Sequence, residues 1–99
     1  MTNIISALKT KSLIESGAQL VDVRSEKEYQ QGAIPGALNL PVNQLEQHAS
    51  TLDTNKPIIV YCRTGGRSAT AQLLLKKIGF QEVHNAGALD NVLCNDCEY

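Results

Sequence analysis

The chain has 99 residues, of which 42% are hydrophobic, and a formal net charge of −1. This near-neutral balance excludes a broad basic surface of the kind that binds nucleic acid or an anionic membrane, so we expect neither as a partner. No apolar run approaches the roughly 20 residues that a membrane helix needs. The length suits one compact domain over residues 1–99, with residues 93–99 as a flexible tail.

The compartment is predicted from the N-terminal residues and the cysteines. The chain begins without a basic segment followed by a continuous apolar one, which a secretory signal requires. Three cysteines are an odd number, and they suit a reducing compartment better than a disulfide framework. We therefore expect a cytoplasmic protein, either as encoded or as a processed form of a longer precursor.

Short apolar strands alternate with helical patterns along the chain. The predicted strands cover residues 19–23, 37–40, 57–61 and 82–85. The helical patterns cover residues 8–16, 42–49, 68–78 and 88–93, and a capping box at residues 25–28 opens a further short helix. This alternation predicts an α/β fold with a mostly parallel sheet and helices on both faces.

The most informative stretch is Val60–Ser68, where Cys62 ends a buried apolar run and opens a short loop. Ser68 is expected to cap the helix that follows. Ligands collect at the carboxyl ends of parallel strands, and a helix N-terminus at this edge presents unpaired amides with positive partial charge. A thiol placed there should ionise easily, so we predict that Cys62 is a nucleophile.

The residues after Cys62 supply what an anionic sulfur needs. Two glycines let the loop curl and turn its backbone N–H groups inward, as a nest for a thiolate or an anionic adduct. Two arginines add positive charge that favours the ionised sulfur and binds an anionic substrate. The candidate binding residues are Arg63, Thr64, Gly65, Gly66 and Arg67. The alternative is a buried structural cysteine flanked by surface arginines.

The spacing Cys-x4-Arg from Cys62 to Arg67 is one residue shorter than the Cys-x5-Arg loop of cysteine-dependent phosphatases. This loop, Asp-Val-Arg at 22–24 and Gly-Ala-Ile-Pro-Gly-Ala-Leu-Asn-Leu-Pro at 32–41 together resemble the rhodanese, or thiosulfate sulfurtransferase, family. Residues 79–87 are similar to the last strand of that family and its exit loop. The chain departs from the family pattern with Ala33 in place of histidine and Ala88 in place of a second glycine, and it has no tryptophan, which the family often places after that glycine pair.

The resemblance implies a rhodanese-like three-layer fold and a sulfurtransferase mechanism. The Cys62 thiolate would take sulfane sulfur from thiosulfate or a persulfide donor and pass it to cyanide or a thiol, including thioredoxin or another sulfur-carrier protein. Arg63 and Arg67 would bind the sulfonate of the donor. Two alternatives stay open: a non-catalytic persulfide carrier or interaction module, and a small-anion phosphatase or arsenate reductase, which the short loop disfavours.

Other polar residues are expected in supporting roles. Asp22 should bind local backbone N–H groups or a nearby arginine, while the resemblance places Arg24 near the rim of the site. Tyr61 alternates away from the nucleophile along its strand and should pack in the core. His48 and His84 are expected to be solvated or satisfied in the core, because a persulfide relay needs no general base once the thiol is ionised.

Cys94 and Cys97 form a Cys-x2-Cys pair near the C-terminus. The pair is a poor candidate for zinc, because the chain has no second such pair and its histidines have no suitable spacing. It is either two incidental thiols in a polar tail or a dithiol that relays persulfide or resolves oxidised Cys62. We expect neither a metal nor a cofactor.

Overall fold

The structure, a computed structural model, describes residues 4–92. Its four strands lie parallel in one sheet in the order β2-β1-β3-β4. They are β1 (Gln19–Asp22), β2 (Leu38–Asn39), β3 (Ile58–Cys62) and β4 (Val83–Ala88). Every residue of the central strand β3 is buried, as its continuous apolar run predicts. Because the strands are parallel, β1 and β3 end at the same edge of the sheet and bring Asp22 beside Tyr61 and Cys62.

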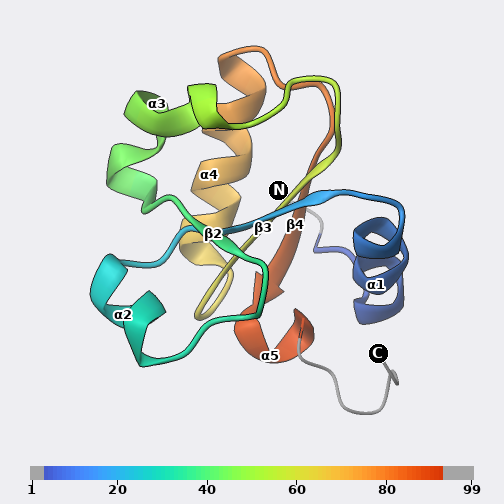
Figure 1. Cartoon of the computed structure of the whole chain (residues 1–99), viewed down its shortest axis with the longest axis vertical. Coiled ribbons are helices and arrows are strands. Elements are labelled where there is room, and N and C mark those ends of the chain that lie inside the picture. The colour runs from blue at the N-terminus through green and yellow to red at the C-terminus, as the bar shows by residue number, and fades with distance from the viewer. Residues whose placement is uncertain (1–3, 93–99) are drawn as a thin grey trace.

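Helices cover both faces of this sheet, which confirms the predicted α/β fold. They are α1 (Ala7–Glu15), α2 (Glu26–Gln31), α3 (Leu45–His48), α4 (Gly66–Lys77) and α5 (Leu89–Val92), with the 3-10 turns η1 (Val42–Gln44) and η2 (Ala49–Thr51). Figure 1 shows α3 and α4 on one side of the sheet and α1 and α5 on the other. None of the helices in residues 4–92 has the length and apolar character that crossing a bilayer requires.

The alternation of side chains along β3 divides the core into two parts. Ile58, Val60 and Cys62 pack with residues of α3 and α4. Ile59 and Tyr61 pack on the opposite face with residues of α1 and α5. The sulfur of Cys62 therefore belongs to the α4 face of the sheet.

The predicted helix over 42–49 and the last predicted strand differ from the observed elements. The helical pattern over 42–49 is divided into η1, α3 and η2, although Leu45 and Ala49 are buried as its spacing predicts. The last strand extends to Ala88, beyond the predicted 82–85. A bulge makes this extension fit, because the pairing register shifts after Asn85 and the left-handed Gly87 (φ 78°) becomes the next paired residue.

Candidate functional site

Cys62 is the last residue of β3, and its exposed fraction is 0%. Residues 63–65 alone connect this strand to α4, because Gly65, at φ 98°, turns the chain directly into the helix as its N-cap. The prediction that Ser68 caps this helix is therefore wrong, since Ser68 lies inside the first turn. The helix begins at Gly66, two residues earlier than the predicted 68–78, and its first amides lie close to the sulfur.

The sulfur atom occupies the position of a helix cap. The backbone N–H of Gly65 donates to Cys62 Sγ over 2.9 Å, and the backbone N–H groups of Thr64 and Ser68 help to lower the pKa of this sulfur. Ser68 is the third residue of α4, and its amide is one that an N-cap side chain ordinarily accepts. Since Gly65 has no side chain to cap the helix, the sulfur takes this role and gains the favourable potential of the helix N-terminus.

The pKa of Cys62 reflects two opposing effects. Burial raises this pKa, because a charged sulfur loses its hydration in the protein interior. Hydrogen bonds from the Ser68 hydroxyl and from the backbone N–H groups of Ser68, Gly65 and Thr64 lower it, and together they outweigh burial. The pKa of Cys62 thus lies below its ordinary value, and the site favours the thiolate.

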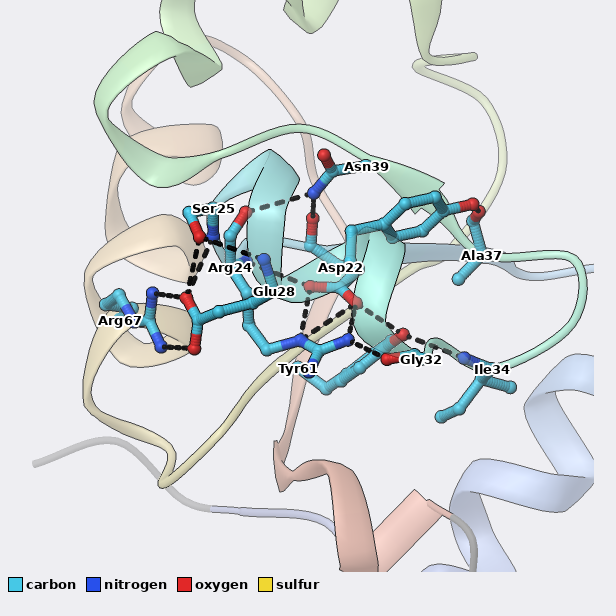
Figure 2. Close-up of polar contacts among 11 residues, drawn as sticks. Asp22, Arg24, Ser25, Glu28, Gly32, Ile34, Ala37, Asn39, Tyr61 and Arg67 are labelled. Carbon is cyan, nitrogen blue, oxygen red and sulfur yellow. Dashed lines mark hydrogen bonds and ion pairs between the residues drawn. The ribbon is translucent and has the colours of Figure 1, made fainter.

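The two arginines of the loop have different surroundings. Arg63 is exposed, lines a cleft and forms no ion pair with another described residue. Arg67 donates from Nη1 to Glu28 Oε1 over 2.6 Å and from Nη2 to Glu28 Oε2 over 3.0 Å (Figure 2). This pairing is the main reason that the pKa of Glu28 falls to about 2 and the pKa of Arg67 rises. The sequence predicts that both arginines bind the substrate, whereas in the structure Arg67 is paired with Glu28 of the same chain.

A cleft of about 540 Å³ opens beside the loop. Its lining residues are Arg24, Glu28, Gln31, Gly32, Ala33, Arg63 and Leu89. Ala33, where the chain departs from the family pattern, therefore forms part of this wall. Arg63, the residue after Cys62 in the chain, brings a positive charge to this cleft, which suits the binding of a small anion. Cys62 itself is buried and is not one of the lining residues.

Asp22 and Arg24 form a buried ion pair that supports the cleft (Figure 2). The carboxylate of Asp22 accepts the backbone N–H of Arg24 over 2.9 Å and its Nη2 over 2.7 Å, as predicted for a local amide and a nearby arginine. The Asp22 carboxylate raises the pKa of Arg24, so the guanidinium stays charged. Arg24 Nη2 also donates to the carbonyl of Gly32 over 2.7 Å and thereby fixes a residue of the cleft wall.

Tyr61 packs in the core as predicted, but its hydroxyl joins the same network. It donates to Asp22 Oδ2 over 2.8 Å and accepts the backbone N–H of Ile34 over 3.3 Å. Burial raises the pKa of Tyr61, so the hydroxyl keeps its hydrogen and remains a donor. The pairing of Tyr61 with Asp22 across β1 and β3 explains this contact, although the sequence pattern shows only an apolar strand.

The two candidate histidines are not among the residues that line the cleft. His48 is exposed, and His84 Nε2 lies 2.8 Å from Glu82 Oε2. The expectation that neither histidine is a base stays a prediction. Cys94 and Cys97 lie outside the described residues.

Comparison with known proteins agrees with this arrangement. The pattern of the family described as "Rhodanese-like domain" matches residues 6–89. The chain belongs to this family. The family predicted from the sequence is thus confirmed, and the parallel sheet with helices on both faces is its fold.

Named relatives and solved structures support the assignment. The chain is 43% identical over 68 residues to the uncharacterized protein YqhL of Bacillus subtilis, covering 69% of this chain and 54% of YqhL, so it spans about half of that relative's length. It is 35% identical over 74 residues to thiosulfate sulfurtransferase PspE of Escherichia coli, covering 73% of this chain and 71% of PspE. The structure of the human single-domain sulfurtransferase TSTD1 matches with a TM-score of 0.82 and 32% identity, covering 96% of this chain and 98% of TSTD1.

Proposed function

We propose that this chain is a sulfurtransferase that carries sulfane sulfur as a persulfide on Cys62. The observation that carries the proposal is the placement of Cys62 Sγ at the N-terminus of α4, where the backbone N–H of Gly65 donates to it and its pKa is lowered. The names of PspE and TSTD1, which are sulfurtransferases, support the same chemistry.

The first half-reaction loads the sulfur. The Cys62 thiolate attacks the outer sulfur of thiosulfate, the sulfur–sulfur bond breaks, and sulfite leaves with the electron pair. The product is a Cys62 persulfide, whose anionic outer sulfur is stabilised by the backbone N–H groups of Thr64, Gly65 and Gly66. A persulfide donor would react in the same way and release a thiolate.

The second half-reaction unloads the sulfur. Cyanide or an acceptor thiolate attacks the outer sulfur, and Cys62 leaves as the thiolate that began the cycle. No proton has to move in either step at a pH where the Cys62 thiol and the attacking acceptor are both ionised. A general base is therefore unnecessary in this mechanism.

The arginines give the site its preference for anions. Arg63 binds the sulfonate of thiosulfate at the rim of the cleft, since its guanidinium forms no ion pair with another described residue. Arg67 supplies positive charge nearer the sulfur, and the charge of Cys62 in turn raises the pKa of Arg67. Arg24 also lines this cleft and holds Gly32 of its wall through the hydrogen bond to the Gly32 carbonyl.

Intact mass and turnover test this proposal. After incubation with thiosulfate, the protein should gain the mass of one sulfur atom, and added cyanide should remove it as thiocyanate. The variant Cys62→Ser should gain no sulfur, because an alcohol is far less acidic than a thiol and forms no persulfide. The matched control is Cys94→Ser/Cys97→Ser, which should load normally.

Two results would contradict the proposal. Sulfur loading retained in Cys62→Ser would place the acceptor at Cys94 or Cys97. Sulfur loading by the unmodified chain without thiocyanate formation would indicate a persulfide carrier that hands its sulfur to a specific protein.

A further inference from the structure

We infer that Ser68 is a positioning residue for the Cys62 thiolate. When the sulfur ionises, the Ser68 hydroxyl rotates so that its hydrogen is donated to the sulfur. The ionisation itself does not depend on the identity of the sulfur donor. The consequence for catalysis rests on the proposed sulfurtransferase function.

The hydroxyl of Ser68 lies among three acceptors. Its oxygen is 3.6 Å from Cys62 Sγ, 2.7 Å from Asn85 Oδ1 and 3.0 Å from the carbonyl oxygen of Gly65. The exposed fractions of Ser68 and Cys62 are 0%, and that of Asn85 is 1%. Burial keeps bulk solvent from competing for this hydroxyl, so its hydrogen is shared among these neighbours.

The direction of the hydrogen bond depends on the charge of the sulfur. A serine hydroxyl has one hydrogen to donate and lone pairs to accept with. While Cys62 is a thiol, its S–H donates to Ser68 Oγ, and Ser68 donates to Asn85 Oδ1 or to the Gly65 carbonyl. A thiolate has no hydrogen and acts only as an acceptor, so the Ser68 hydroxyl then gains most by turning toward the sulfur.

The acceptors that Ser68 leaves remain hydrogen-bonded. Asn85 Oδ1 also accepts the backbone N–H of Gly87 over 2.8 Å, and the Gly65 carbonyl accepts the backbone N–H of Ala69 over 3.1 Å. Turning the hydroxyl therefore leaves no buried acceptor without a donor, and the change costs little.

Charged groups around the sulfur do not replace this donor. On α4, the terminal nitrogens of Arg67 contact Glu28 of α2. On β1, Asp22 pairs with Arg24, and in the loop Arg63 is exposed at the cleft. β4 presents the uncharged amide of Asn85, which reaches the sulfur only through Ser68.

The test measures the thiolate directly through the pH dependence of alkylation. The experiment uses the full chain with the substitutions Cys94→Ser and Cys97→Ser, so that Cys62 is the remaining cysteine that iodoacetamide can alkylate. In Ser68→Ala the midpoint pH of the alkylation rate should rise by about one unit. At any pH below this midpoint, the ratio of thiolate to thiol at Cys62 should therefore be about tenfold lower. Thermal melting confirms that each variant is folded.

Thr70, two residues after Ser68 in the same helix, provides a matched control. Thr70 Oγ1 donates to the Gly66 carbonyl over 3.4 Å, so Thr70→Ala also removes a hydroxyl bonded to the first turn of α4 but leaves the sulfur untouched. Its alkylation midpoint should equal that of the parent. The conservative variant Ser68→Thr keeps the hydroxyl and should keep the low midpoint.

Specific results would overturn the inference. These are an unchanged midpoint in Ser68→Ala, an equal rise in Thr70→Ala, or a rise in Ser68→Thr as large as that in Ser68→Ala. Because alkylation needs no sulfur donor, these readouts remain interpretable if the protein fails to load sulfur. Failure of the sulfurtransferase proposal would instead appear only in the mass and thiocyanate assays.

Discussion

Arg67 and Glu28 join α4 to α2 through two parallel contacts of 2.6 and 3.0 Å, although 39 residues separate them in the chain. Glu28 also accepts the backbone N–H of Ser25 over 3.1 Å, which completes the capping box of α2. The same carboxylate thus caps the N-terminus of α2 and binds Arg67 in the first turn of α4, the helix that follows the nucleophile Cys62. The position of α2 along the cleft is therefore tied to the charge of Glu28.

Acid should break this connection at a defined pH. The pKa of Glu28 in the folded protein is about 2, lowered from 4.5 mainly by Arg67. A carboxyl group whose pKa falls on folding contributes stability above its ordinary pKa and loses it as pH falls through the folded pKa. The melting temperature of the unmodified chain should therefore exceed that of Glu28→Gln by a constant amount down to about pH 4.5, and the difference should vanish toward pH 2.

The control for this prediction is Glu26→Gln in the first turn of the same helix, because Glu26 forms no ion pair with a described residue. The difference in melting temperature between the unmodified chain and Glu26→Gln should change much less between neutral and acid pH. A Glu28→Gln difference that stayed constant below pH 4.5 would show that the ion pair does not stabilise the fold.

Local signals in the sequence were sufficient to predict most of the elements. The apolar run over residues 57–61 predicted β3, and the capping box at 25–28 predicted the start of α2. Such patterns work because burial and capping are decided within a few neighbouring residues. Ser68 was misassigned because serine is a good N-cap, whereas the N-cap of the helix is the left-handed Gly65, whose backbone N–H donates to the sulfur of Cys62 three residues earlier.

The contacts of the site between distant residues could not be predicted in the same way. Cys62 and the loop after it were identified from spacing, yet no local pattern indicates that Arg67 pairs with Glu28. The contact of Tyr61 with Asp22 follows from the pairing register of β1 and β3, which the sequence does not specify. These are consequences of tertiary structure, where partners are chosen by topology and not by spacing along the chain.

The two loop arginines should contribute unequally to the binding of an anionic donor. Arg63→Ala should raise the KM for thiosulfate about tenfold with little change in kcat, since it removes a charge-assisted contact to the bound anion. Arg67→Ala should raise this KM by a smaller factor, because the terminal nitrogens of Arg67 already contact Glu28. Steady-state kinetics with thiosulfate and with a neutral organic trisulfide measure both effects, which should be smaller for the neutral donor.

Lys77→Ala is the control for net charge, because Lys77 ends α4 at the opposite pole of the helix from the loop. Its KM for thiosulfate should match that of the unmodified chain. Equal losses with the anionic and the neutral donor in Arg63→Ala would contradict anion binding and indicate a structural role for the residue.

The left-handed backbone of Gly65 should be necessary for both the fold and the reactivity of Cys62. A Cβ at this position would meet Gly87 Cα at 3.5 Å, an ordinary contact, so the cost of Gly65→Ala comes from its φ of 98°. A left-handed alanine costs about 1–2 kcal/mol, which for a domain of this size lowers the melting temperature by roughly 4–16 °C. Relaxing that strain turns the Gly65 N–H away from the sulfur, so alkylation of Cys62 at neutral pH should also slow.

Gly66→Ala is the matched comparison, because the next residue is the first of α4 and its Cβ would have no neighbour within 4 Å. Alanine is the better helix former, so this variant should melt at or above the temperature of the unmodified chain and alkylate at the same rate. Both variants are measured by thermal melting and by iodoacetamide kinetics in the background that retains only Cys62. An alkylation rate that stayed the same in Gly65→Ala would show that the Gly65 amide does not stabilise the thiolate, and an equal loss of stability in both variants would remove the role assigned to the left-handed turn.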